Sequence, residues 1–150
     1  MKDSQAGASC LPIFQADFDW SAWVGFPFVM WGRGPSAYDC WGLVRDVMRE
    51  GLGVTLPSYV EYADSVIGGD GERVLMEKMQ TLTCWESVPI EEARPFDVIV
   101  LNIAGHPNHV GVICMDKQFL HVERGGESQI ERYKSRRWKS RIEGIYRYCP

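Results

Sequence analysis

Residues 35–53 form the segment PSAYDCWGLVRDVMREGLG, which carries the clearest helical signal in the chain. An apolar stripe with helical spacing runs along one side of residues 39–50, formed by Leu43, Val44, Val47 and Met48. The charged side chains fall largely on the other side, and Gly51 and Gly53 supply a C-terminal stop. This pattern predicts an amphipathic helix with one buried face.

Cys40 lies where this helix begins, with Asp39 or Ser36 as its N-cap residue. The N–H groups of a first helical turn and the positive end of the helix dipole favour a thiolate over a thiol. Cys40 also precedes Val44 by one turn, so its side chain should face the body of the domain. Two interpretations stay open at this point, a buried structural cysteine and a nucleophile.

The composition describes one acidic domain. With 150 residues, 45% of them hydrophobic, the chain is long enough for a real core. We expect a lead-in over residues 1–16 and a single domain over 17–150. A net charge of -4 argues against a nucleic-acid partner. The basic run ERYKSRRWKSR, residues 131–141, is interpreted as a solvated face near the last strand rather than as a patch for an anionic partner.

The N-terminal residues MKDSQAGASCLPIF lack an apolar segment of signal-peptide length. No segment approaches the roughly 20 apolar residues of a membrane span. We therefore expect synthesis in the cytoplasm without a signal peptide, no membrane partner, and a final location there or in an assembly formed there.

The cysteines are odd in number and scattered, at positions 10, 40, 84, 114 and 149. This argues against a disulfide framework, and the absence of a CxxC pair argues against structural metal. Most of these thiols are expected to be small buried hydrophobes.

The rest of the chain predicts an α+β fold. DFDWSAWVG, residues 17–25, is expected to form a short first helix, and residues 72–80 a second one. Short β-rich segments separated by turn residues then follow as an antiparallel meander, at 97–103, 109–115, 118–123, 128–134 and 143–149.

A nucleophilic cysteine needs a base, and the chain has three histidines to offer. His106 lies in a GHPN turn and is interpreted as an exposed loop residue. His109 opens one expected strand and His121 closes the next, twelve residues later. A hairpin turning about Met115 would place these two directly opposite each other on one face. A turn centred on Met115-Asp116 would place them on opposite faces, and the local turn signal is Asp116-Lys117.

The order Cys, His, His favours catalysis over three separate structural roles. Cys40 would be the nucleophile, and His109 the base that takes its proton and later protonates the leaving amine. His121 would orient the imidazole of His109, and backbone N–H groups at the helix start could stabilise an oxyanion.

On these residues the chain resembles the NlpC-type cell-wall cysteine peptidases, a papain-like family. The similarity lies in YDCWGLVR (38–45), PFDVIVL (95–101) and HVGVICMDKQFLHVE (109–123). They are similar to the family's cysteine-helix motif, its Asp-Val strand and its two-strand histidine hairpin with the same spacing. The resemblance covers roughly residues 20–148.

The resemblance implies a papain-like α+β fold in which N-terminal helices, including the Cys40 helix, pack on a small antiparallel sheet. It also implies hydrolysis of an amide bond in the peptidoglycan stem peptide, commonly the one between the γ-carboxyl of D-Glu and a diamino acid. Cys40, His109 and His121 match the family triad, and neither cofactor nor metal is implied. Asp39 matches an acid that helps to bind the free amine of the substrate in relatives, besides its role as a helix cap.

Three aromatic residues near the nucleophile, Tyr38, Trp31 and Trp41, are candidates to line the substrate cleft. Trp41 stands where relatives from bacterial walls have Ser, so the indole could reshape that cleft. Phe96 replaces the usual Gly before the Asp of the second motif.

The form GRGPSAYDCWG is similar to the branch of the family found with phage tails, which implies other tail proteins as partners. Two alternatives remain. One is a structural tail-tip assembly protein with little activity, and the other is a different papain-like amidase or acyltransferase, because any acyl-enzyme route can use the same triad.

Overall fold

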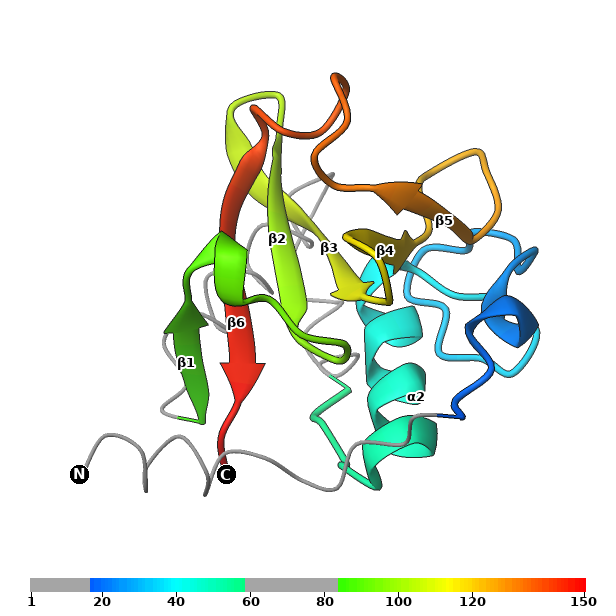
Figure 1. Ribbon diagram of the computed structural model, residues 1–150. Helices are drawn as coiled ribbons and strands as arrows, with labels where there is room; N and C mark the ends of the chain where they lie inside the picture. The colour runs from blue at the N-terminus through cyan, green and yellow to red at the C-terminus, as the bar shows by residue number, and fades with distance from the viewer. Residues whose placement is uncertain (1–16, 59–83) are drawn as a thin grey trace.

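One α-helix packs on an antiparallel sheet in the computed structural model, which describes residues 17–58 and 84–150 (Figure 1). The helix α2 spans Cys40–Leu52, and two short 3-10 segments, η1 and η3, span Trp20–Trp23 and Ile90–Glu92. The six strands are β1 (Trp85–Val88), β2 (Val98–Ile103), β3 (His106–Ile113), β4 (Gln118–His121), β5 (Gln129–Arg132) and β6 (Ile142–Tyr148). This is the predicted α+β class. The predicted lead-in and second helix lie outside the described residues.

The strand order β1-β6-β2-β3-β4-β5 departs from the predicted meander. Strands β2 to β5 do follow one another, but β6 returns to pair with β2 on its other side. An ion pair between Arg147 of β6 and the buried Asp97, with a nitrogen–oxygen distance of 2.8 Å, accompanies this return. Strand β1 was not predicted, because Val88 is its only buried residue and so its four residues carry no apolar periodicity.

The helix confirms the prediction for residues 39–50 and extends it to Leu52. The side chain of Asp39 caps the first turn by accepting from the Gly42 N–H at 2.7 Å. At the other end Gly53 adopts a left-handed conformation with φ of 68°, and its N–H bonds to the carbonyls of Arg49 and Met48. The first predicted helix is present as η1, which Asp19 caps.

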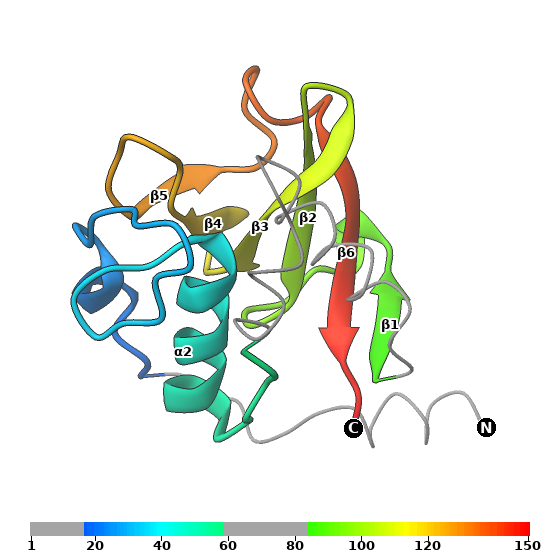
Figure 2. The same cartoon turned by 180° about the vertical axis from the view of Figure 1, so that it is seen from behind.

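The sheet separates two layers of core. On one face, side chains of β2, β3 and β4 such as Val100, Val112 and Leu120 pack with the apolar stripe of α2. On the other face, Ile99, Ile113, Phe119 and others pack around Trp138. The N-terminal end of α2 lies beside β4 in both views (Figures 1 and 2).

Phe96 adopts a backbone conformation that suits glycine better than a residue with a side chain. Its φ of 73° lies in the left-handed region, which is costly for a residue with a side chain. The ring offsets that cost by packing edge-on against Phe18, with centroids 5.1 Å apart, and by covering Gly51. A Cβ on Gly51 would come within 2.1 Å of the Phe96 ring, so the two residues depend on each other.

Cysteine usage agrees only partly with expectation. Cys40 and Cys114 are buried free thiols and Cys84 is a half-buried one. Cys149 is disulfide-bonded, which the scattered, odd set of cysteines did not predict. In the described part of the chain, no helix has the length and apolar character needed to cross a membrane.

Candidate active site

Cys40 is the first residue of α2, and only 2% of its surface is exposed. It belongs to the core layer on the helix side, with Val110 and Val122 among the other residues of that layer. The sequence-based placement of this thiol at a helix N-terminus and facing the body of the domain is therefore confirmed.

The loop before α2 is built tightly against the helix start. A Cβ on Gly42 would lie 2.0 Å from the carbonyl oxygen of Gly32, so only glycine allows this approach. The Gly32 carbonyl accepts from the N–H of Asp39 and from the Arg33 guanidinium. That guanidinium also forms an ion pair with Asp39 at 2.7 Å. These contacts fix the backbone on which Cys40 is presented.

The two candidate histidines meet, in a register that differs from both turns considered from the sequence. The pairs Val112↔Leu120 and Ile113↔Phe119 show that the hairpin turns about Asp116. The structure therefore has neither the turn about Met115, which gives direct opposition, nor the turn about Met115-Asp116, which gives opposite faces. Asp116 and Lys117 both adopt positive φ, at 56° and 60°, which agrees with the local turn signal there.

In this register His121 faces Gly111, and His109 lies two residues further along β3 on the same face of the sheet. The diagonal is short enough for a hydrogen bond, with His109 Nε2 and His121 Nδ1 2.9 Å apart. Gly111 leaves room for it, because a Cβ there would lie 3.2 Å from the Cβ of His121 and 2.8 Å from the Phe119 ring.

Trp138 seals the histidine pair on the face away from α2. Its ring is stacked on His109 with centroids 5.9 Å apart and meets His121 edge-on at 5.2 Å. Phe119 stacks on His121 with centroids 4.3 Å apart and also meets Trp138 edge-on at 5.6 Å. Burial lowers the pKa of both imidazoles, and the Arg137 cation lowers them further, so both histidines are neutral at pH 7.

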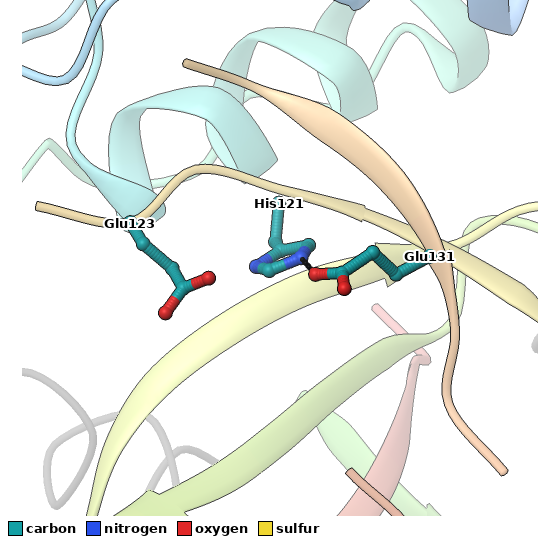
Figure 3. A group of neighbouring side chains, drawn as sticks. All are labelled: His121, Glu123 and Glu131. Carbon is teal, nitrogen blue, oxygen red and sulfur yellow. Dashed lines mark hydrogen bonds and ion pairs between the residues drawn. The ribbon is translucent and has the colours of Figure 1, made fainter. Parts of the chain in front are cut away.

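Two residues that the sequence-based reasoning missed complete this network. The second ring nitrogen of His121, Nε2, lies 2.6 Å from a carboxylate oxygen of Glu131 on β5 (Figure 3). Arg137 binds Glu131 at 3.4 Å and Glu123 at 2.7 Å, and its guanidinium lies 4.2 Å above the Trp138 ring. Residues 131–141, which were interpreted as a solvated basic face, thus supply the buried Trp138 that packs on the histidines and the Arg137 that pairs with both glutamates.

A surface pocket of about 360 Å³ opens next to His109. Its lining includes His109 together with Phe28, Asn108, Glu123 and Arg124. This volume lies in the range of small-molecule sites, and the pocket offers both charge signs beside the predicted base.

The sequence model of the NlpC/P60 family matches residues 25–147. The chain belongs to the NlpC/P60 family. Members of this family are typically cysteine hydrolases, and the family acts on peptidoglycan peptides. The match contains all three residues of the predicted triad.

Two curated relatives of this NlpC/P60 domain come from different settings. It is 27% identical over 129 residues to gamma-DL-glutamyl hydrolase of Bacillus subtilis (strain 168), covering 84% of this chain and 27% of that protein. It is 25% identical over 111 residues to tail tip assembly protein K of Escherichia phage lambda, covering 73% and 53%. The chain thus spans between about a quarter and about half of the length of these relatives.

Solved structures confirm the NlpC/P60 fold. The chain superposes on an NlpC/P60 family protein from Bacillus cereus ATCC 10987 with a TM-score of 0.63 and 18% identity, over 95% of this chain and 43% of the other. It superposes on the NlpC/p60 domain of the peptidoglycan hydrolase SagA with a TM-score of 0.55 and 16% identity, over 95% of each chain.

The predicted cleft residues of this NlpC/P60 domain turn out to be mostly buried. Tyr38 is 2% exposed and donates its hydroxyl to Asp46, while Trp41 is 1% exposed and donates Nε1–H to the Pro57 carbonyl. Both side chains offer almost no surface to a ligand, so the indole at position 41 fills core. Trp31 is half-buried, with the Arg33 guanidinium 5.8 Å from its ring centre.

Asp39 confirms its predicted role as helix cap. Asp39 is 1% exposed, and its carboxylate already accepts hydrogen bonds from the Gly42 N–H and the Arg33 guanidinium. A substrate amine would have to compete with that guanidinium, so the ion pair makes amine binding by Asp39 costly.

Proposed function

We propose that this domain is a cysteine peptidase that hydrolyses amide bonds of peptidoglycan stem peptides, at the bond between the γ-carboxyl of D-Glu and a diamino acid. The observation that carries the proposal is the buried hydrogen bond between His109 and His121, within a match to a family of cysteine hydrolases. Cys40 at the N-terminus of α2 is the third member.

The chemistry follows from which ring nitrogens are engaged. His109 uses Nε2 toward His121, so Nδ1 is the nitrogen that takes the thiol proton of Cys40. The thiolate attacks the amide carbonyl, and His109 returns the proton to the leaving amine as the C–N bond breaks. Water, deprotonated by the same imidazole, then hydrolyses the thioester and restores the thiol.

Cys40 belongs to the core layer on the helix side, and His109 contacts Trp138 of the other layer. The N-terminal end of α2 lies beside β4, the strand that His121 closes (Figure 2). We propose that Cys40 and His109 meet at this end of the helix. Helix-terminal N–H groups there would stabilise the oxyanion.

Two features of the relatives support the finer parts of the proposal. One relative is called a gamma-DL-glutamyl hydrolase, which agrees with a γ-glutamyl bond as target. The other is a tail tip assembly protein, which agrees with a protein carried in a phage tail together with other tail proteins.

That second relationship also favours the alternative of a tail-tip assembly protein with little activity. Against it stands the cost of burying two imidazoles, which a purely structural domain has no chemical reason to keep. A different amidase or an acyltransferase would use the same three residues and differ only in the acyl acceptor.

Digestion of purified stem peptides, followed by chromatography and mass spectrometry, tests the proposal. The wild type and the control Cys84→Ala, which removes a half-buried thiol, should release the fragment that begins with the diamino acid. Cys40→Ser should lose at least about a thousandfold in rate. Cleavage by Cys40→Ser at the wild-type rate, or no cleavage by any form, would overturn the proposal.

A further inference from the structure

The buried histidine His121 has hydrogen-bond partners on both ring nitrogens. Its Nδ1 lies 2.9 Å from His109 Nε2, and its Nε2 lies 2.6 Å from a Glu131 carboxylate oxygen. The side chain of His121 is fully buried while that of Glu131 is 25% exposed, so Glu131 connects the pair to the surface. Figure 3 shows His121 between Glu123 and Glu131 and marks a hydrogen bond from His121 to Glu131 but none to Glu123.

The positions of the hydrogens along the hydrogen-bonded row His109, His121 and Glu131 follow from one fact. A carboxylate only accepts hydrogen bonds. His121 must therefore carry its hydrogen on Nε2, which leaves a lone pair on Nδ1. That lone pair accepts from His109, so His109 also carries its hydrogen on Nε2. The Nδ1 atom of His109 is then left with a basic lone pair.

We propose that Glu131 is a positioning residue that sets the tautomers of both histidines and thereby makes Nδ1 of His109 the basic nitrogen. The catalytic consequence rests on the proposed function, whereas the tautomers do not. The conclusion holds for neutral imidazoles, and burial among Trp138 and Phe119 keeps both rings neutral at pH 7.

Arg137 holds the carboxylate of Glu131 in place. Its Nη2 binds both oxygens of Glu123 at 2.8 and 2.7 Å, and its Nη1 reaches Glu131 at 3.4 Å. The guanidinium is itself supported by the face of Trp138, at 4.2 Å. The same segment therefore covers the histidines and fixes the group that orients them.

His121, Glu123 and Glu131 could also form a cation site, because their ligand atoms lie within 4.8 Å of one another. Two observations favour the hydrogen-bonded chain instead. Arg137 already supplies a positive charge to both carboxylates. In addition, an Nε2 atom that donates to Glu131 at 2.6 Å has no lone pair for a metal.

Long-range ¹⁵N–¹H correlation spectra of histidine-labelled protein at pH 7 test the inference directly, because they report which ring nitrogen carries hydrogen. In the wild type both His109 and His121 should be Nε2–H tautomers. Glu131→Leu, which removes the acceptor at similar volume, should give His121 a mixture of tautomers. Glu131→Gln keeps an acceptor oxygen and should retain the wild-type tautomers.

Glu123→Leu is the matched control, because Glu123 shares Arg137 with Glu131 but has no hydrogen bond to His121 in Figure 3. It should leave both tautomers as in the wild type. An Nδ1–H form of either histidine in the wild type, or unchanged tautomers in Glu131→Leu, would overturn the inference. So would a Glu131→Gln spectrum that matches Glu131→Leu.

Stem-peptide hydrolysis supplies the second measurement. Glu131→Leu should lower kcat about 10- to 100-fold with little change in KM, and Glu131→Gln should recover most of that loss. A wild type with the expected tautomers but no hydrolase activity would refute the proposed function and leave the role of Glu131 intact. Full activity in Glu131→Leu, despite altered tautomers, would remove the catalytic consequence.

Discussion

The two sides of the candidate site are built by different means. The helix side, Gly32 to Trp41, has its cap and ion pair between residues close in sequence, Asp39 with Gly42 and with Arg33, and hydrogen bonds to Pro57 and Ser58 add to them. The histidine side joins β3, β4 and β5 with Arg137 and Trp138, through strand register and aromatic packing. Contacts between residues close in sequence can be recognised as a sequence motif. Contacts between distant residues depend on the fold and leave no such motif.

If the packing of His109 and His121 depends on the Trp138 ring that covers them, then loss of Trp138 should have the largest effect on stability. The side chain is fully buried and touches both histidines, so Trp138→Ala should cost about 3–5 kcal/mol of unfolding free energy. Chemical denaturation at pH 7 measures it. The half-buried Trp31 offers a control whose replacement by Ala should cost clearly less, and equal costs would contradict the account.

Gly111 tests how closely the two strands must approach. A Cβ in Gly111→Ala would lie 2.8 Å from the Leu120 carbonyl oxygen and from the Phe119 ring, so the hairpin must shift. We expect a loss of about 1–3 kcal/mol and a weaker contact between the histidines. Gly126→Ala, where the nearest atom is 3.5 Å away, should change stability by less than about 0.5 kcal/mol. A neutral Gly111→Ala would show that the register is wrong.

The pH dependence of stability should also come from the histidine side. Burial lowers the pKa of His109 and His121 from 6.5 to about 3, so below pH 6.5 the unfolded chain takes up protons that the native fold does not. Stability should therefore fall as the pH drops, by at most about 1.4 kcal/mol per pH unit for each histidine. Urea unfolding at pH 7 and pH 5 measures the loss, which should shrink in His121→Asn. Equal stability at both pH values would contradict neutral, buried rings.

Substitutions on the helix side should cost less stability. Two variants of Asp39 can separate the contribution of the helix cap from that of the ion pair. Asp39→Ala removes the acceptor for Gly42 and should cost about 1 kcal/mol, with a further cost for the half-buried Arg33 left without its carboxylate. Asp39→Asn keeps the cap and should lose less. If thermal unfolding shows equal losses for both variants, the ion pair alone matters.

The sequence was informative where the determinants are local. The cap at Asp39, the stop at Gly53 and the apolar stripe predict α2 almost to the residue. The strands from β2 to β6 follow from short β-rich segments and the turns between them, except that β3 begins at His106, which was expected in a loop. The position of β6 between β1 and β2 could not be predicted, because pairing of distant strands leaves no short-range signal.

The candidate site divides in the same way. The pairing of His109 with His121 was suggested by their spacing, but a shift of one residue in the turn changes the geometry, and only the structure fixes Asp116 as its centre. Glu131 and Arg137 could not be identified, since an exposed-looking charge in a polar segment has no distinguishing pattern. Trp41 was expected beside the cleft, and its burial shows that sequence proximity to a nucleophile does not imply access.

Alkylation of the thiols by iodoacetamide as a function of pH tests the central claim, that Cys40 is activated by His109. Peptide mass spectrometry would follow Cys40 and the half-buried Cys84 in the wild type and in His109→Gln. The account predicts that Cys40 reacts faster than Cys84 at pH 6, well below the ordinary thiol pKa of about 8.5, and that His109→Gln abolishes this advantage. Cys40 reacting no faster than Cys84, or equally fast without His109, would contradict it.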